Sequence, residues 1–239
     1  MREEARTKRQ LIDELREARR QLRELQCPET QRKFVDEALK QSFDKVQLIL
    51  EQAIWAMALT IEMRDPFTAG HQRRVTNLAC AVAKGMDLPG GTIGVIRMAG
   101  GVHDIGKIHI PAEYLSKPGR LTTVEFGAIR AHPEVGYSIL KTIEFPWPIA
   151  EIVYQHHERL DGSGYPQGLS GSDILVEARV LAVADVVEAM ASHRPYRPAL
   201  GIDKALEEIS RNRDVLYDPN AVDACLKVCS EQGFDLSFW

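Results

Sequence analysis

Histidine and acidic side chains are the residues of this sequence best suited to chemistry. Five of the seven histidines lie beside other polar residues in otherwise apolar, helix-like surroundings: His71, His103, His132, His156 and His157. His103 is followed directly by Asp104 and then by Lys107, which brings an imidazole, a carboxylate and an ammonium group together. A carboxylate at the end of an apolar helix is costly to bury unless it is paired or binds a metal. These residues therefore predict a buried polar centre.

The types of these side chains indicate which metals such a centre would bind. Asp185 lies in the apolar run Val183 to Val187, where an acid needs a partner. Imidazoles and carboxylates without thiolates are ligands of divalent Fe, Mn, Ni or Zn. Two such ions about 3.5–4 Å apart polarise a phosphoryl group and lower the pKa of a shared water, which is suited to hydrolysing phosphodiesters. Taken singly, each residue is better explained as a buried polar group with a hydrogen-bond partner, but that explanation does not account for all of them at once.

A glycine-rich segment follows His156-His157-Glu158 and breaks the helical spacing. Residues 161–173 contain Gly162, Gly164, Gly168 and Gly171, with Tyr165-Pro166 between them. Glycine allows backbone conformations closed to other residues and a close approach to a ligand. The segment is therefore either a ligand-facing loop or an ordinary flexible surface loop.

The elements that must position these residues are predicted to be helices, which makes the fold class all-α. The apolar spacing predicts helices over about 34–61, 71–86, 92–103, 123–131, 133–142, 148–157, 175–192, 202–213 and 219–232. Thr122 and Glu125 have the spacing of a capping box at the start of one of them. The valine-rich segment 174–187 could also be a buried strand, but its length and its alanines favour a helix.

The first 33 residues are predicted to form a helical linker, and residues 34–239 the main domain. Leu11, Leu15, Ala18, Leu22 and Leu25 alternate in steps of four and three among charged residues, as in a short coiled-coil seam. Cys27-Pro28 is expected to break this pattern. The seam predicts a homodimer, with a surface helix packed on its own domain as the alternative. A charged helix of this kind is also typical of the linker behind an upstream sensor domain.

Composition excludes several classes of function. The net charge of −4 gives no basic field for DNA, and the four cysteines lack the density of a disulfide framework. No run of about 18 uncharged apolar residues predicts a membrane span. A reducing, cytoplasmic location is therefore expected. The sequence also lacks a phosphate loop, a nucleophile elbow and a dinucleotide-binding fingerprint.

Together these motifs closely resemble the HD-GYP family, a branch of the HD metal-dependent phosphohydrolases. The resemblance rests on HDIGK at 103–107, HHERLDGSGYP at 156–166, and RVLAVADVVEAM followed by SHRPYR at 179–197, with His71 and His132. It implies an all-α HD-domain bundle that hydrolyses the bacterial messenger cyclic di-GMP to pGpG, with further hydrolysis to GMP left open. One alternative is a phosphohydrolase of another cyclic dinucleotide. A second alternative is a catalytically idle module that binds nucleotide or protein.

The resemblance also implies roles for individual residues. His71, His103, Asp104 and Asp185 would hold one metal, and Asp104 would bridge to a second held by His132, His156 and His157. Lys107 would neutralise the phosphate, and the loop carrying Tyr165 would shape the site and offer a face to a protein partner. Arg194 and Arg197 would contact phosphate or guanine groups, unless they are ordinary surface arginines. Some family members hold a third metal with an acid at the position of Phe67, so two metals are expected here.

Overall fold

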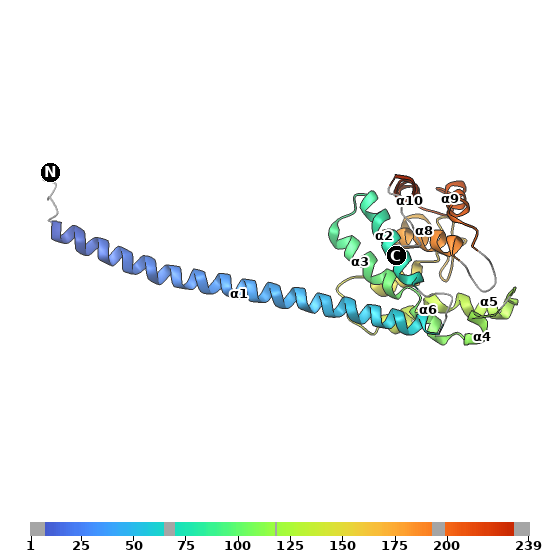
Figure 1. Ribbon diagram of the computed structural model, residues 1–239, viewed down its shortest axis with the longest axis horizontal. Helices are drawn as coiled ribbons and strands as arrows, with labels where there is room; N and C mark the ends of the chain where they lie inside the picture. The colour runs from blue at the N-terminus through green and yellow to red at the C-terminus, as the bar shows by residue number, and fades with distance from the viewer. Residues whose placement is uncertain (1–7, 65–69, 118, 193–198, 232–239) are drawn as a thin grey trace. The chain divides into compact units, whose positions relative to one another are not determined.

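The computed structural model describes residues 8–64, 70–117, 119–192 and 199–231. All regular elements in these ranges are helices, which confirms the predicted all-α class (Figure 1). The chain divides into two compact units, residues 1–51 and 52–239. The predicted functional division between residues 33 and 34 stays a prediction. None of the described helices combines the length and the apolar character needed to cross a membrane.

The long first helix, α1 (Lys8–Glu62), contradicts the predicted break at Cys27-Pro28, because it continues through the proline. A proline inside a helix removes one hydrogen bond and crowds the preceding turn at a cost of about 3 kcal/mol, but the bonds on either side remain. Among the residues of the first unit whose side chains the structure describes, none is buried: Leu39, Phe43 and Val46, for example, are 68%, 60% and 61% exposed. The apolar positions before and after Pro28 therefore belong to one helix.

The core of the second unit forms around α8 (Val176–Ala191), the valine-rich segment for which a helix was correctly predicted. Apolar side chains on several sides of α8 are fully buried, among them Val180, Leu181, Val183 and Val187. A helix that is apolar nearly all round must be covered by neighbours. Those neighbours are α2 (His71–Gly85), α3 (Gly90–Val102), α7 (Ile149–Gln155), α9 (Ile202–Arg211) and α10 (Pro219–Glu231) (Figure 1).

Shorter elements connect α3 to α7. They are the 3-10 helix η2 (Ile105–His109), α4 (Ala112–Leu115), α5 (Thr123–Arg130) and α6 (His132–Leu140), with η3 (Gly171–Asp173) later in the chain. The capping box before α5 is confirmed, since Thr122 and Glu125 each accept a hydrogen bond from the other's backbone N–H. The sequence did not predict η2 or α4, because five and four residues are too few to show a helical period.

Candidate metal centre

Helix ends bring the candidate ligands together. His71 and His132 are the first residues of α2 and α6, whereas His103 and His156 directly follow α3 and α7. Asp185 lies in the middle of α8. Because α2 and α3 both pack on α8, and α6 packs on α7, the ends of four helices meet around this acid. The polar residues therefore converge inside an apolar core.

Two groups of possible ligand atoms result. One consists of His71, His103 and Asp185, and the other of His132, His156 and His157; within each group the atoms lie within 4.8 Å of one another. Five of these six residues are buried, and the His157 side chain is 18% exposed. Each group has the size and the donor types of a site for a divalent metal ion.

Asp104 lies between the two groups and faces both. Its Oδ2 is 3.6 Å from Nε2 of His71 and 3.5 Å from Nε2 of His103. Its Oδ1 is 3.4 Å from Nε2 of His132. A carboxylate with one oxygen toward each group is placed as a bridging ligand would be. Asp185 makes a similar connection, because its Oδ1 lies 3.3 Å from Nε2 of His71 and its Oδ2 lies 4.0 Å from Nδ1 of His157.

Backbone carbonyl groups fix the orientation of three of the imidazole rings through their Nδ1 atoms. The Nδ1 atoms of His103, His132 and His156 donate to the carbonyls of Gly100, Ile129 and Val153, at 2.8, 2.8 and 2.6 Å. In each case the acceptor is three residues earlier, and the Nε2 lone pair is left for the centre. Nε2 of His103 is fully buried and has no hydrogen-bond partner among the described residues. Such an orphaned nitrogen is what a metal ligand leaves in the absence of the ion, so these residues fit a metal.

The protonation states of the same residues are suited to binding a cation. Burial lowers the pKa of His132 to about 4 and that of His156 to about 3. Both imidazoles are therefore neutral at pH 7 and need lose no proton to bind a metal. Burial by itself raises the pKa of Asp104, but neighbouring positive charge, above all Lys107, outweighs it and holds that pKa well below the ordinary range. Asp104 is thus ionised.

We expect the metal-free protein to lose stability as the pH falls from about 6.5 to about 4. In this range His132 and His156 bind protons in the unfolded chain and stay neutral in the folded one. Each should contribute about 1.4 kcal/mol per pH unit. Urea unfolding with a chelator at pH 5 and pH 7.5 measures the effect. His132→Gln should reduce the slope, whereas His109→Gln, on the surface, should not; equal stability at both pH values would contradict the expectation.

The glycine-rich loop is fixed against the second group of ligands. The Tyr165 ring stacks on His157, with centroids 4.7 Å apart and planes at 27°. The Arg130 guanidinium lies 4.3 Å from the centre of the same tyrosine ring. Gly164 is pressed so closely on Glu158 that an added Cβ would lie 2.4 Å from its Cα. The loop therefore packs against the candidate centre through Tyr165 and His157, while its role in facing a ligand stays a prediction.

The Glu158 side chain holds this loop in place through hydrogen bonds to its backbone. Its buried carboxylate accepts hydrogen bonds from the backbone N–H groups of Gln167, at 2.7 Å, and Leu169, at 3.1 Å. We expect Glu158→Ala to release the loop, because the two N–H groups lose their acceptor at about 1–3 kcal/mol each. Faster amide exchange at residues 165–169 would show this. The exposed Glu151→Ala in α7 is the control; unchanged exchange in Glu158→Ala would refute this role.

The remaining predicted residues have different outcomes. Lys107 forms an ion pair with Asp104, with Nζ 2.6 Å from Oδ2. Arg194, Arg197 and Phe67 lie outside the described residues. Sequence reasoning missed Glu188, which is fully buried in α8. The rule that singled out Asp185, an acid within an apolar helix, would have found Glu188 three residues later.

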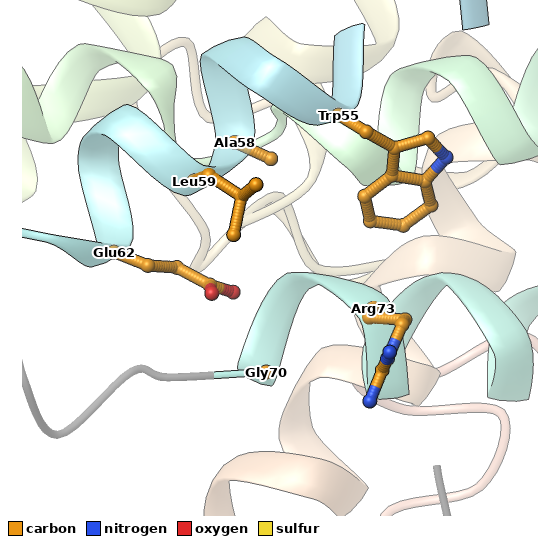
Figure 2. A pocket seen from close by; sticks show the side chains of 6 residues that line it. All are labelled: Trp55, Ala58, Leu59, Glu62, Gly70 and Arg73. Atoms are coloured by element: carbon orange, nitrogen blue, oxygen red, sulfur yellow. The ribbon is translucent and has the colours of Figure 1, made fainter. Parts of the chain in front are cut away.

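A separate pocket of about 490 Å³ lies beside the start of α2. It is lined by Trp55, Ala58, Leu59, Glu62, Gly70 and Arg73. Figure 2 shows the first four of these residues on the last turns of α1, Gly70 directly before α2 and Arg73 in the first turn of α2. Although Gly70 directly precedes His71, none of the candidate ligands lines this pocket, and it is not part of the metal centre.

The family model described as HD domain matches residues 56–221, a stretch that contains all seven candidate ligands. The chain belongs to the HD domain family, and its predicted resemblance to the HD-GYP branch is confirmed.

Particular relatives carry more specific names. The chain is 40% identical over 195 residues to the cyclic di-GMP phosphodiesterase response regulator RpfG of Xanthomonas campestris, covering 81% of this chain and 52% of that protein. It is 34% identical over 178 residues to the 3'3'-cGAMP-specific phosphodiesterase 3 of Vibrio cholerae, covering 74% and 39%. The chain thus spans about half the length of these relatives or less. The HD domain of the L. monocytogenes phosphodiesterase PgpH, solved in complex with cyclic-di-AMP, shares the fold at a TM-score of 0.54 and 23% identity, covering 74% and 98%.

Proposed function

We propose that this chain is a metal-dependent phosphodiesterase that hydrolyses cyclic di-GMP to pGpG, with further hydrolysis to GMP left open. The observation that carries the proposal is the placement of Asp104, whose two carboxylate oxygens face two separate groups of buried ligand atoms. The names of the relatives support the same reaction class. An idle module would have no need to keep seven metal-binding groups intact, which disfavours that alternative.

The proposed cofactors are two divalent ions of Fe, Mn, Ni or Zn. His71, His103 and Asp185 would hold one, His132, His156 and His157 the other, and Asp104 would contact both. When bound, such ions act as Lewis acids on the phosphate and lower the pKa of a water nucleophile. The two buried carboxylates, Asp104 and Asp185, offset much of the positive charge that this centre would carry.

Other residues would handle the substrate. The Lys107 ammonium group is paired with Asp104 beside the candidate metal centre. From this position it can neutralise the charge of a phosphate oxygen. Tyr165, fixed between His157 and Arg130, would form one wall of the substrate site. Arg194 and Arg197 are proposed to contact the phosphates or the guanine bases, because an arginine fork matches either with two hydrogen bonds.

The test is incubation of the purified chain with cyclic di-GMP and Mn(II) or Fe(II) without oxygen, followed by chromatography of the products. The proposal expects pGpG or GMP to form and to disappear when the metal is chelated. Absence of product from protein that holds two metals per chain would overturn the choice of substrate. Protein that binds no metal would overturn the enzyme and favour the idle signalling module.

A second candidate substrate is 3'3'-cGAMP, named for the relative from Vibrio cholerae. It contains the same phosphodiester linkages, so the metal centre alone would not distinguish it from cyclic di-GMP. Incubating the protein with both dinucleotides at equal concentration shows which one it hydrolyses faster. If 3'3'-cGAMP is preferred, it takes the place of cyclic di-GMP as the proposed substrate.

We also propose that the chain forms a homodimer through α1. The seven-residue spacing of Leu11, Ala18 and Leu25 skips Arg32 and resumes in the same register at Leu39 and Val46. That of Leu15 and Leu22 skips Glu29 and Asp36 and resumes at Phe43 and Leu50. An isolated helix with exposed apolar side chains gains little stability by itself, whereas a second copy would cover this seam.

Replacing both Leu39 and Val46 with glutamine is expected to convert the dimer to a monomer in analytical ultracentrifugation. The effect should be large because each side chain would be buried against its counterpart. Leu48→Gln is the matched control, since Leu48 is 54% exposed but lies off the seam. A double variant that sediments like the unchanged protein would contradict the coiled coil.

Three further proposals accompany this function. The chain would act behind a sensor domain and receive its signal through α1. The Tyr165 loop would be available to a protein partner as well as to the substrate. A cytoplasmic location fits the free thiols of Cys80, Cys225 and Cys229.

A further inference from the structure

Glu188 is a fully buried carboxylate that contacts a candidate metal ligand without belonging to either ligand group. Its Oε2 accepts a hydrogen bond from Nδ1 of His71. Its Oε1 accepts from Nε of Arg74 at 2.8 Å and from Oγ of Ser192 at 2.7 Å. Both oxygens are thus directed at protein donors, and the arrangement ties α2 to α8.

His71 is oriented differently from the three histidines described above. Nδ1 of His103, His132 and His156 each donates to a backbone carbonyl three residues earlier. Nδ1 of His71, at the first position of α2, donates to a side-chain carboxylate from another helix. A carboxylate is the stronger acceptor, because it carries a full negative charge.

We propose that Glu188 is a positioning residue for the metal centre, acting through His71. The hydrogen bond keeps the proton on Nδ1, so that Nε2 of His71 presents its lone pair near Asp104 and Asp185. A carboxylate behind an imidazole also increases the electron-donating power of the ring toward a metal. Arg74 and Ser192 hold Glu188 in place. The inference rests on the proposed metal-dependent function.

The spacing along α8 gives this arrangement a further consequence. Asp185 and Glu188 are three residues apart, so they lie on one face of the helix, one turn from each other. Helix α8 therefore supplies both a candidate ligand and the support of another ligand. The ligand group formed by His71, His103 and Asp185 depends on α8 in two ways. In the other group, the hydrogen bonds and ion pairs of His132, His156 and His157 go to residues other than Glu188.

The test compares metal binding in Glu188→Gln with that of the unchanged chain. Glutamine keeps the shape and one acceptor oxygen but removes the charge. Titration of the metal-free protein with Mn(II) or Zn(II) against a competing chelator should show one site weakened about 10- to 100-fold and the other unchanged. Glu188→Asp, which restores the charge on a shorter side chain, should recover part of the affinity.

Asp218→Asn is the matched control, because Asp218 is also a buried carboxylate paired with an arginine of α8, Arg179, at 2.6 Å. Its loss should lower the melting temperature without changing metal affinity. Equal metal affinity in Glu188→Gln and the unchanged chain would overturn the positioning role, even if the variant were less stable. If the unchanged chain itself binds no metal, the proposed function fails rather than this inference alone.

Discussion

Replacing Asp104 with asparagine is expected to empty both metal positions and to reduce phosphodiester hydrolysis by several orders of magnitude. Asparagine has nearly the same shape, so the fold should remain, but it removes the negative charge that lies between the two ligand groups and faces both of them at 3.4–3.6 Å. The proposed reaction needs the metals to activate its nucleophile. Metal content by elemental analysis and product formation from cyclic di-GMP measure the two effects separately.

The matched control is Asp203→Asn, which removes an exposed carboxylate in the first turn of α9. It should leave metal content and turnover unchanged. If Asp104→Asn keeps two metals per chain, the bridging position is assigned to the wrong residue. If it keeps its activity as well, the proposed centre is not the site of hydrolysis.

The second large effect is expected for Gly106→Ala, which should destabilise the fold and eliminate the metal group around His132. An added Cβ would lie 1.9 Å from the backbone oxygen of His132 and 2.6 Å from the backbone nitrogen of Gly136. Because these are backbone atoms of α6, no side chain can rotate away, and the whole helix must shift. We expect a loss of about 3 kcal/mol, at the upper end of overpacking in a core.

Gly127→Ala provides the control, since nothing lies within 4 Å of an added Cβ at that position in α5. It should stabilise the protein slightly, by about 0.5–1 kcal/mol, because alanine loses less conformational freedom than glycine in a helix. Urea unfolding and metal titration of both variants test the contrast. Equal stability of the two would mean that η2 and α6 do not approach each other as closely as the structure shows.

The helices were predicted well wherever an apolar period ran for three turns or more. The predictions for α2, α3 and α8 were close to the observed bounds, because one buried face imposes its spacing on the residues themselves. The break at Pro28 was wrong, since proline weakens a helix locally and need not end it. The short elements η2 and α4 were not predicted, because they have too few residues to show a repeating apolar pattern.

The sequence by itself determined the chemistry of the centre. Residue types are fixed by the sequence, and imidazoles beside carboxylates in apolar helices require partners whatever the fold. The seven candidate ligands, Lys107 and the glycine loop were therefore all recognisable before any coordinates. The residue types do not identify the metal, because Fe, Mn, Ni and Zn accept the same donor atoms.

Only the tertiary structure decided how these groups face one another. Contacts between segments up to 117 residues apart produce three features of the site. They place Asp104 between the two ligand groups, Glu188 behind His71, and Glu158 against the glycine-rich loop. No local spacing encodes such distances, since they depend on how helices pack around α8. The same packing explains Gly106 and Gly164, whose missing side chains matter only because another part of the backbone occupies the space.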